Sequence, residues 1–219
     1  MNHDHLKTRQ RAERHAHPPN LALRVHRAIS WLHRAELQAG QGDRDGEFIF
    51  LWIAFNAAYA TVIDERYRLD EQRTFRAFLQ KLVDLDGDRT RLDGLVWEAF
   101  PGNIRVLLDN PYVFQDFWNF HNGALPEDEW KRRFDEAKRV AKGALAARDT
   151  VTVLGVALSR IYTLRNQLMH GGATWNSSVN RDQIRDCTAL MGRLVPVVIE
   201  IMLDHPETLW GDACYPVVE

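Results

Sequence analysis

Hydrophobic residues recur every three or four positions along most of the chain, and no segment alternates convincingly as a β-strand would. From Leu21 to Gln38 the apolar side chains fall on one stripe, with arginines and histidines opposite, which predicts an amphipathic helix. Residues 47–64 are apolar nearly all round, so a helix here should be buried on several sides. A third amphipathic helix is expected over residues 71–83.

The second half of the chain predicts longer helices. The run "LPEDEW" places a proline and three acids at a helix start, and this helix should extend to about Ala147. The apolar run that follows should form a helix ended by Gly171 and Gly172. A last helix is expected over residues 181–203, with Pro196 inside it. The fold class is therefore predicted to be all-α, a helical bundle.

Two segments interrupt this pattern. Residues 1–19 are polar and rich in histidine, and they end in two prolines, which predicts a flexible polar tail. Residues 90–125 are rich in aromatic residues and broken by proline and glycine, so short helices and loops are expected there. Their rings could stack on bases, but aromatic residues at helical spacing more often pack a small core.

Composition narrows the class of protein. The chain has 219 residues and a formal net charge of −2, which argues against broad, non-specific coating of nucleic acid. Cys187 and Cys214 form no CxxC pair, so neither a disulfide framework nor a zinc module is expected. No secretory signal and no membrane-spanning run is recognisable. We expect a cytoplasmic protein with no metal and no cofactor.

The candidate chemistry lies in the segment "IYTLRNQLMHGG", residues 161–172. On an ideal helix Arg165 occupies a stripe of otherwise apolar residues, so its permanent charge needs an anionic partner or a water-filled cleft. Asn166 and His170 are four residues apart and share a face with Tyr162. Arg165 and His170 differ by roughly 140°. They can converge through the reach of the arginine, a distortion of the helix end, or a second copy of the helix.

These residue types suit the cleavage of a phosphodiester bond. A histidine can take a proton from a ribose 2′-hydroxyl or give one to the leaving oxygen. An arginine can hold the phosphate oxygens as charge builds on them, and an asparagine can orient the histidine or the substrate. The plain structural alternative is a helix cap, because histidine and arginine near a helix C-terminus interact favourably with its dipole and its free carbonyls.

Two sequence features resemble one family. "RNQLMHGG" resembles the R-N-x-x-x-H signature of HEPN domains, and "LWIAFNAAYA" looks like the early apolar helix of HEPN members, in particular the Apea-like group. The resemblance covers residues 21–64 and 148–204. It implies one HEPN-like domain over residues 20–219, with an up-and-down four-helix core and a helical insertion at about 70–147.

The resemblance also implies an activity. Many HEPN proteins are metal-independent ribonucleases of toxin–antitoxin or phage-defence systems, and they form homodimers in which the motifs of two chains make one composite site. Carried onto this chain, Arg165 and His170 would be catalytic, with Asn166 beside them. RNA would be the substrate, and an antitoxin or defence protein a possible partner.

Four further residues are candidates for substrate binding. Arg160 and Arg181 flank the motif and could meet RNA phosphates, although arginines on helix faces are usually solvated. Trp175, in the loop after the motif, could stack on a base or pack against the bundle. Tyr162 shares the face of Asn166 but is better explained by core packing. Two functional alternatives stay open: a non-catalytic HEPN-like module that binds nucleotide, RNA or protein, and a structural helical protein.

Overall fold

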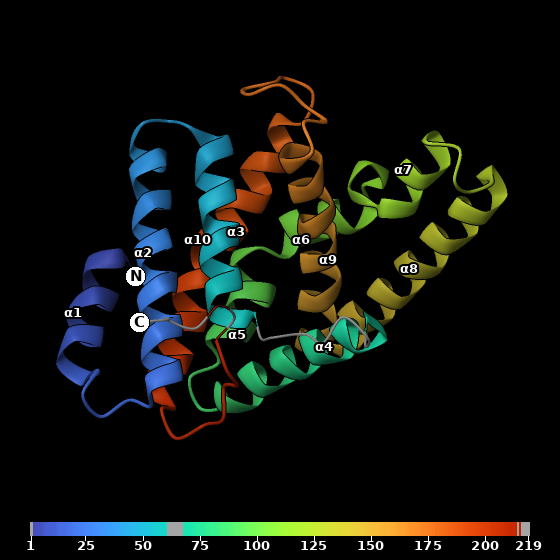
Figure 1. Cartoon of the computed structure of the whole chain (residues 1–219). Coiled ribbons are helices and arrows are strands. Elements are labelled where there is room, and N and C mark those ends of the chain that lie inside the picture. Colours follow the sequence, from blue (N-terminus) through green and yellow to red (C-terminus); the bar gives the residue numbers. More distant parts are fainter. Residues whose placement is uncertain (1, 61–67, 214, 216–219) are drawn as a thin grey trace. The chain divides into compact units, whose positions relative to one another are not determined.

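The computed structural model describes residues 2–60, 68–213 and 215, and it is helical throughout, with no β-strand in those residues (Figure 1). The predicted all-α class is therefore confirmed. The chain divides into two compact units: residues 1–91 together with 184–219, and residues 92–183. No helix among the described residues is long and apolar enough to cross a membrane.

The first unit contains the helices α1, α2, α3, α4 and most of α10. Their bounds are His3–Glu13, Pro19–Gly40, Arg44–Tyr59, Arg68–Leu85 and Arg181–Asp204, and α10 enters the unit at Ile184. Helices α2 and α3 lie side by side (Figure 1). Helix α10 packs close to α3, since a Cβ added to Gly192 would lie 3.9 Å from Leu51 Cδ1. Each of these helices contributes at least one fully buried apolar side chain: Leu6, Val25, Phe48, Leu82 and Val198 in chain order.

Helix α3 corresponds to the predicted apolar helix and begins three residues earlier than expected. Asp43 caps it, because its carboxylate accepts a hydrogen bond from the amide of Gly46 at 3.0 Å. Phe48, Leu51 and Phe55 are buried on this helix, as the nearly continuous apolar pattern predicted. The last residues of the predicted range, 61–64, lie outside the described residues.

The N-terminal segment corrects the expectation of a flexible tail over residues 1–19. Residues His3–Glu13 form helix α1, which contacts α2. Leu6 is fully buried, and the amide of His3 donates a hydrogen bond to Glu36 at 2.8 Å. A single buried leucine among polar residues leaves almost no hydrophobic periodicity, so the sequence pattern gave no sign of this packing.

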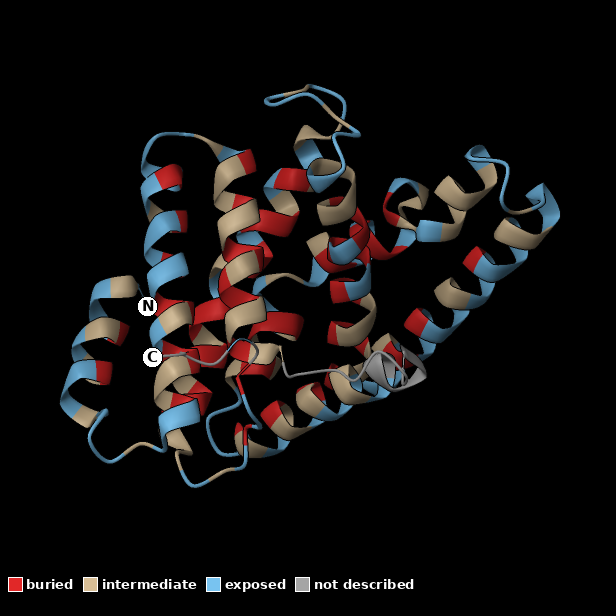
Figure 2. Cartoon of the chain, viewed as in Figure 1, coloured by how far each residue is buried: buried red, intermediate tan, exposed pale blue. Residues whose placement is uncertain are grey.

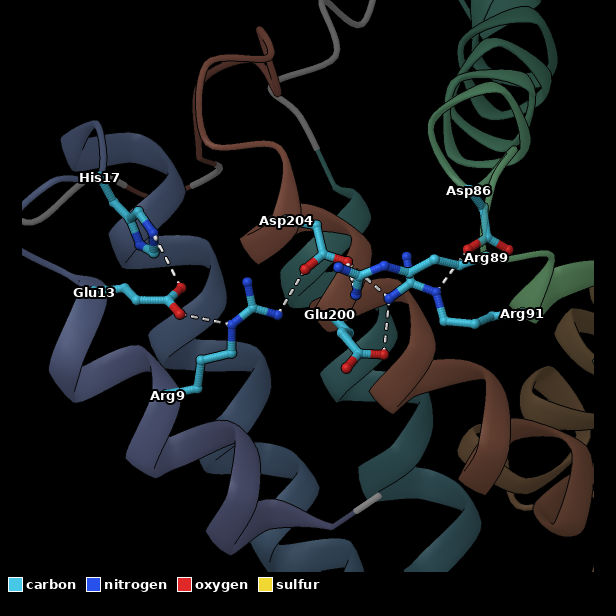
Figure 3. A network of polar contacts seen from close by, with 8 residues as sticks. All are labelled: Arg9, Glu13, His17, Asp86, Arg89, Arg91, Glu200 and Asp204. Carbon is cyan, nitrogen blue, oxygen red and sulfur yellow. Dashed lines mark hydrogen bonds and ion pairs between the residues drawn. The ribbon is translucent and has the colours of Figure 1, made fainter.

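A network of charged residues joins α1 to the end of α10 (Figure 3). Arg9 contacts Asp204 at 2.8 Å, and Arg91 contacts the same carboxylate at 2.9 Å. Arg89 adds a third contact at 2.9 Å. Burial by itself would raise the pKa of Asp204, but the hydrogen bonds from Arg9 and Arg91 outweigh it and hold this pKa below its ordinary value. The carboxylate therefore stays charged and ties together segments that are far apart in the sequence.

A buried arginine fixes the C-terminal segment of the same unit. Arg24 on α2 donates hydrogen bonds to the carbonyl oxygens of Ala58 at 2.9 Å, Gly211 at 3.2 Å and Asp212 at 2.5 Å. The side chain is almost completely withdrawn from solvent. Its charge is tolerated because backbone oxygens take up the guanidinium hydrogens that water would otherwise solvate.

The second unit is built from short helices followed by two long ones. The short elements are α5 (Arg91–Gly94), the π-helix η2 (Leu95–Ala99), α6 (Pro101–Asp109), the 3-10 turn η3 (Pro111–Val113) and α7 (Gln115–His121). The long helices are α8 (Glu127–Ala147) and α9 (Thr150–Met169). The predicted break into short helices over residues 90–125 is thus confirmed. The expected insertion at 70–147 is divided, because α4 belongs to the first unit.

The aromatic residues of this segment pack a small core of their own, as predicted. Phe117 of α7 lies at the centre of it, with its ring centroid 5.3 Å from that of Trp130 and 5.2 Å from that of Trp118. The ring of Phe134 on α8 packs at a tilt against that of Phe114, with the two ring centroids 5.1 Å apart. These pairs join α7 to α8 and leave few of the rings free to stack on a ligand.

Helix α9 is held at its N-terminus by polar contacts. Asp149 caps it by accepting a hydrogen bond from the amide of Thr152 at 2.9 Å. The hydroxyl of Thr150 donates to Asp93 and accepts from the indole nitrogen of Trp97 at 2.9 Å. These contacts orient α9 within the second unit and thereby place the motif at its far end.

Candidate functional site

The end of helix α9 is shaped by two glycines. The amide of Gly172 donates to the carbonyl of Gln167 at 2.7 Å, and the amide of Gly171 donates to that of Leu168 at 3.2 Å. Gly171 has φ +70°, which a glycine adopts without strain. This pair of bonds is a Schellman motif, and it makes His170 the C-cap of the helix, directly after its last residue Met169. The predicted helix end is confirmed.

Arg165 and Asn166 contact one another directly. The Nη1 of Arg165 donates a hydrogen bond to Asn166 Oδ1 at 2.9 Å. The Nε of Arg165 is buried and has no hydrogen-bond partner among the described residues. Asn166 therefore orients the arginine, whereas the sequence suggested that it orients the histidine or the substrate.

His170 lies on an exposed face of α9. Met169 and Tyr162 on the same face are 50% and 48% exposed, and Asn166 between them is half-buried. The His170 side chain makes no hydrogen bond, ion pair or ring contact among the described residues. Its imidazole is thus not used as a cap on its own helix carbonyls.

The loop after the motif is exposed along most of its length (Figure 2). Trp175 in this loop is 72% exposed. Arg181 begins α10 and donates from its Nε to the carbonyl of Ser177 at 2.9 Å. Arg181 thereby fixes the end of the loop as well as carrying a positive charge there.

Arg160 lies elsewhere on α9 and is buried. Only 3% of it is exposed, and its guanidinium lies 4.4 Å from the ring centroid of Phe114 and 5.5 Å from that of Phe134. Burial lowers the pKa of Arg160 to about 10. Its Nε has no hydrogen-bond partner among the described residues. The structure thus places Arg160 inside the aromatic core, apart from the exposed face that holds His170.

One contact beside the motif was not anticipated from the sequence. Gln167, in the middle of "RNQLMH", donates to the backbone carbonyl of Tyr112 at 2.6 Å, and Trp118 donates to the same oxygen at 2.8 Å. The Tyr112 ring is exposed. The aromatic segment is therefore anchored on the motif helix. Every residue has a backbone carbonyl, so the sequence pattern does not indicate which carbonyl accepts the hydrogen bond from Gln167.

No family model matches the sequence, no curated protein matches it, and no solved structure matches its fold.

No group of three or more histidine, cysteine, aspartate or glutamate side chains within residues 2–60, 68–213 and 215 is placed to hold a metal ion. Cys187 is free and buried, and burial raises the pKa of its thiol well above the ordinary value, so it is not set up as a nucleophile.

The arrangement offers a defined chemistry at one end of α9. An exposed imidazole can transfer protons, and an arginine stands five residues earlier. The neighbouring asparagine fixes that arginine. An exposed tryptophan lies in the next loop. Such a set suits an anionic substrate that has a flat group to stack.

Proposed function

We propose that this protein is a metal-independent ribonuclease of HEPN type, which acts as a cytoplasmic homodimer in a toxin–antitoxin or phage-defence role. The observation that carries the proposal is the end of α9, where His170 is exposed and uncommitted while Arg165 is oriented by Asn166. A helix cap alone would use the histidine against its own carbonyls, and His170 makes no such contact.

In the proposed reaction His170 of one chain is the general base for the ribose 2′-hydroxyl, and His170 of the second chain is the general acid for the leaving 5′-oxygen. Arg165 holds the non-bridging oxygens of the phosphate as negative charge builds on them. Asn166 orients the guanidinium by accepting a hydrogen bond from it. Together these groups provide proton transfer and charge stabilisation, so the chemistry asks for no metal.

The homodimer is proposed because one helix does not bring all these groups together. Arg165 and His170 are separated by roughly 140° around α9. The exposed face with Tyr162, Met169 and Asn166 offers apolar area and one amide, a suitable surface for a second copy of the same helix. Two copies related by twofold symmetry would place the arginine of one chain beside the histidine of the other.

A second function is a non-catalytic module that binds a partner protein, such as an antitoxin or defence component. Trp175 and Val179, both in the loop after the motif, are highly exposed hydrophobic residues, which is typical of a protein-binding surface. This alternative keeps the dimer and predicts no RNA cleavage.

The test is cleavage of a labelled single-stranded RNA by the purified protein in excess chelator. Arg165→Ala and His170→Ala should each slow cleavage by at least ~100-fold, because each removes a group used in the transition state. His15→Ala and Arg193→Ala are matched controls, since both residues are exposed. Unchanged cleavage by a folded His170→Ala protein would refute the proposal.

A further inference from the structure

A groove on the second unit lies between α6 and α8, apart from the motif at the end of α9. It has a volume of about 360 Å³, and its apolar side is formed by Leu108, Ala141 and Leu145. Arg105 of α6 and Lys138 and Lys142 of α8 line it as well. Asp109 is the acid among its lining residues. The groove therefore combines an apolar wall with an excess of positive charge.

The cations of this groove are largely uncommitted. Arg105 and Lys142 are exposed and make no ion pair or hydrogen bond among the described residues. Lys138 contacts Asp135 at 2.9 Å, and its ammonium lies 4.8 Å from the ring centroid of Phe134. In contrast, the cations of the first half of α8 are paired, Lys131 with Glu127 and Arg132 with Glu129. Two of the three cations that line the groove, Arg105 and Lys142, are thus without an ion pair among the described residues.

Positive charge also continues along α8 beyond the groove. From residue 137 to residue 148 every charged side chain is basic, whereas residues 127–136 hold more acids than bases. Attraction to the helix dipole does not account for this, because that effect is confined to the last turn and the last turn of α8 holds no basic residue. A run of basic residues without an acid among them, in a chain of net charge −2, is a local feature that needs its own explanation.

We propose that this groove binds the phosphate backbone of single-stranded RNA, away from the bond that is cleaved. Lys138 and Lys142 are one helical turn apart, about 6 Å along the axis, and Arg105 stands on the other helix. A strand lying between them meets cations from both sides, and its sugars and bases lie against Leu108 and Leu145. The identity of the strand as RNA rests on the proposed function, while the binding of a polyanion rests on the groove alone.

The experiment measures binding of a labelled single-stranded RNA by fluorescence anisotropy at several salt concentrations. The charge-reversing double variant Arg105→Glu/Lys142→Glu should weaken binding by at least ~10-fold and make the salt dependence shallower, by about 1.4 in the logarithmic slope for two lost phosphate contacts. The matched control is Lys131→Glu/Arg132→Glu, which makes the same change of charge on the acidic half of the same helix and should alter binding less than ~3-fold.

Equal weakening by both double variants, no effect of the groove variant, or no RNA binding by the unmodified protein would overturn the inference. Displacement of the RNA by inorganic phosphate at matched ionic strength would also overturn it, since it assigns the groove to a single anion. If charge reversal destabilises the protein, Arg105→Gln/Lys142→Gln tests the same contacts with a smaller change.

A dinucleotide substrate is too short to reach the groove, so the groove variant should cleave it at the same rate as the unmodified protein. Binding without any cleavage would instead reject the proposed function and leave the groove assignment standing.

Discussion

Arg165 donates a hydrogen bond from Nη1 to the Oδ1 of its neighbour Asn166, at 2.9 Å. Adjacent residues of a helix point about 100° apart, so the two side chains meet only because the arginine bends toward the amide. This leaves the guanidinium held at one edge while its buried Nε stays without a partner among the described residues. The contact assigns Asn166 to the arginine and leaves His170 free.

Asn166→Ala tests this relationship. Removing the amide frees the guanidinium to move, so we expect RNA cleavage to fall by about tenfold through kcat, with a smaller effect on KM, since orientation matters most in the transition state. Thermal unfolding should change little, because Asn166 is only half-buried. A variant that keeps the unmodified rate would show that the arginine needs no orientation by its neighbour.

Asp204→Asn tests the charged network of the first unit. Three arginines contact this carboxylate, so its loss should lower the free energy of unfolding by about 2 kcal/mol near neutral pH. The pKa of Asp204 is lowered in the folded protein, so this stabilisation is present above the unfolded pKa of about 4 and is lost as the pH falls through the folded pKa. The variant and the unmodified protein should therefore differ less in their free energy of unfolding, measured with urea, as the pH is lowered.

Glu127→Gln is the control for that measurement. Glu127 makes an exposed ion pair with Lys131 at 2.5 Å, and exposed pairs contribute little to stability. If the Asp204→Asn protein is as stable as the control variant at neutral pH, the network has no part in joining α1 to α10.

Leu6→Ala tests whether α1 belongs to the folded core. Leu6 is fully buried, so its truncation should cost about 2–4 kcal/mol of unfolding free energy. Leu37→Ala, on an exposed leucine of α2, should cost much less and serves as the control. Chemical denaturation followed by circular dichroism measures both. If Leu6→Ala leaves the free energy of unfolding unchanged, residues 1–19 behave as the flexible tail that the sequence predicted.

Arg160→Met tests the buried guanidinium of α9. The lowered pKa, about 10, means that the charged form destabilises the fold at every pH below that value, and the penalty is relieved as the pH rises through it. The two aromatic rings offset part of the cost, about 1–2 kcal/mol. Methionine is apolar and of similar length, so the variant should be as stable as the unmodified protein or more stable by about 1–2 kcal/mol.

The measurement is urea unfolding near neutral pH, with Arg132→Met as the exposed control. A loss of more than about 1 kcal/mol in Arg160→Met alone would show that the ring contacts outweigh the desolvation of the charge. RNA binding by the same variant should be unchanged, since Arg160 is withdrawn from solvent.

The long helices could be predicted because their apolar residues repeat at 3.6-residue spacing over many turns. The end of α9 could also be predicted, since two glycines after an apolar run are typical of a helix C-terminus. Helix α1 could not, because Leu6 and a few polar contacts provide nearly all its packing. Its hydrophobic pattern is too sparse to distinguish it from a solvated tail.

The candidate site was only partly predictable for a related reason. Helical phase places Asn166 and His170 on one face, and both lie there. Phase alone does not show which arginine is withdrawn into the core, and Arg160 is buried because the rings of a distant segment, Phe114 and Phe134, close over it. The division of the chain into two units depends on contacts between segments far apart in the sequence, which local patterns do not report.

The central claim is that two chains together form one RNA-cleaving site, and mixing of subunits tests it most directly. Unmodified protein is mixed with His170→Ala protein at constant total concentration, allowed to exchange subunits, and assayed for RNA cleavage in excess chelator. If both histidines are needed in one site, activity should follow the square of the unmodified fraction, leaving about a quarter in an equal mixture. A linear fall to about a half, or no cleavage by the unmodified protein, would contradict the account.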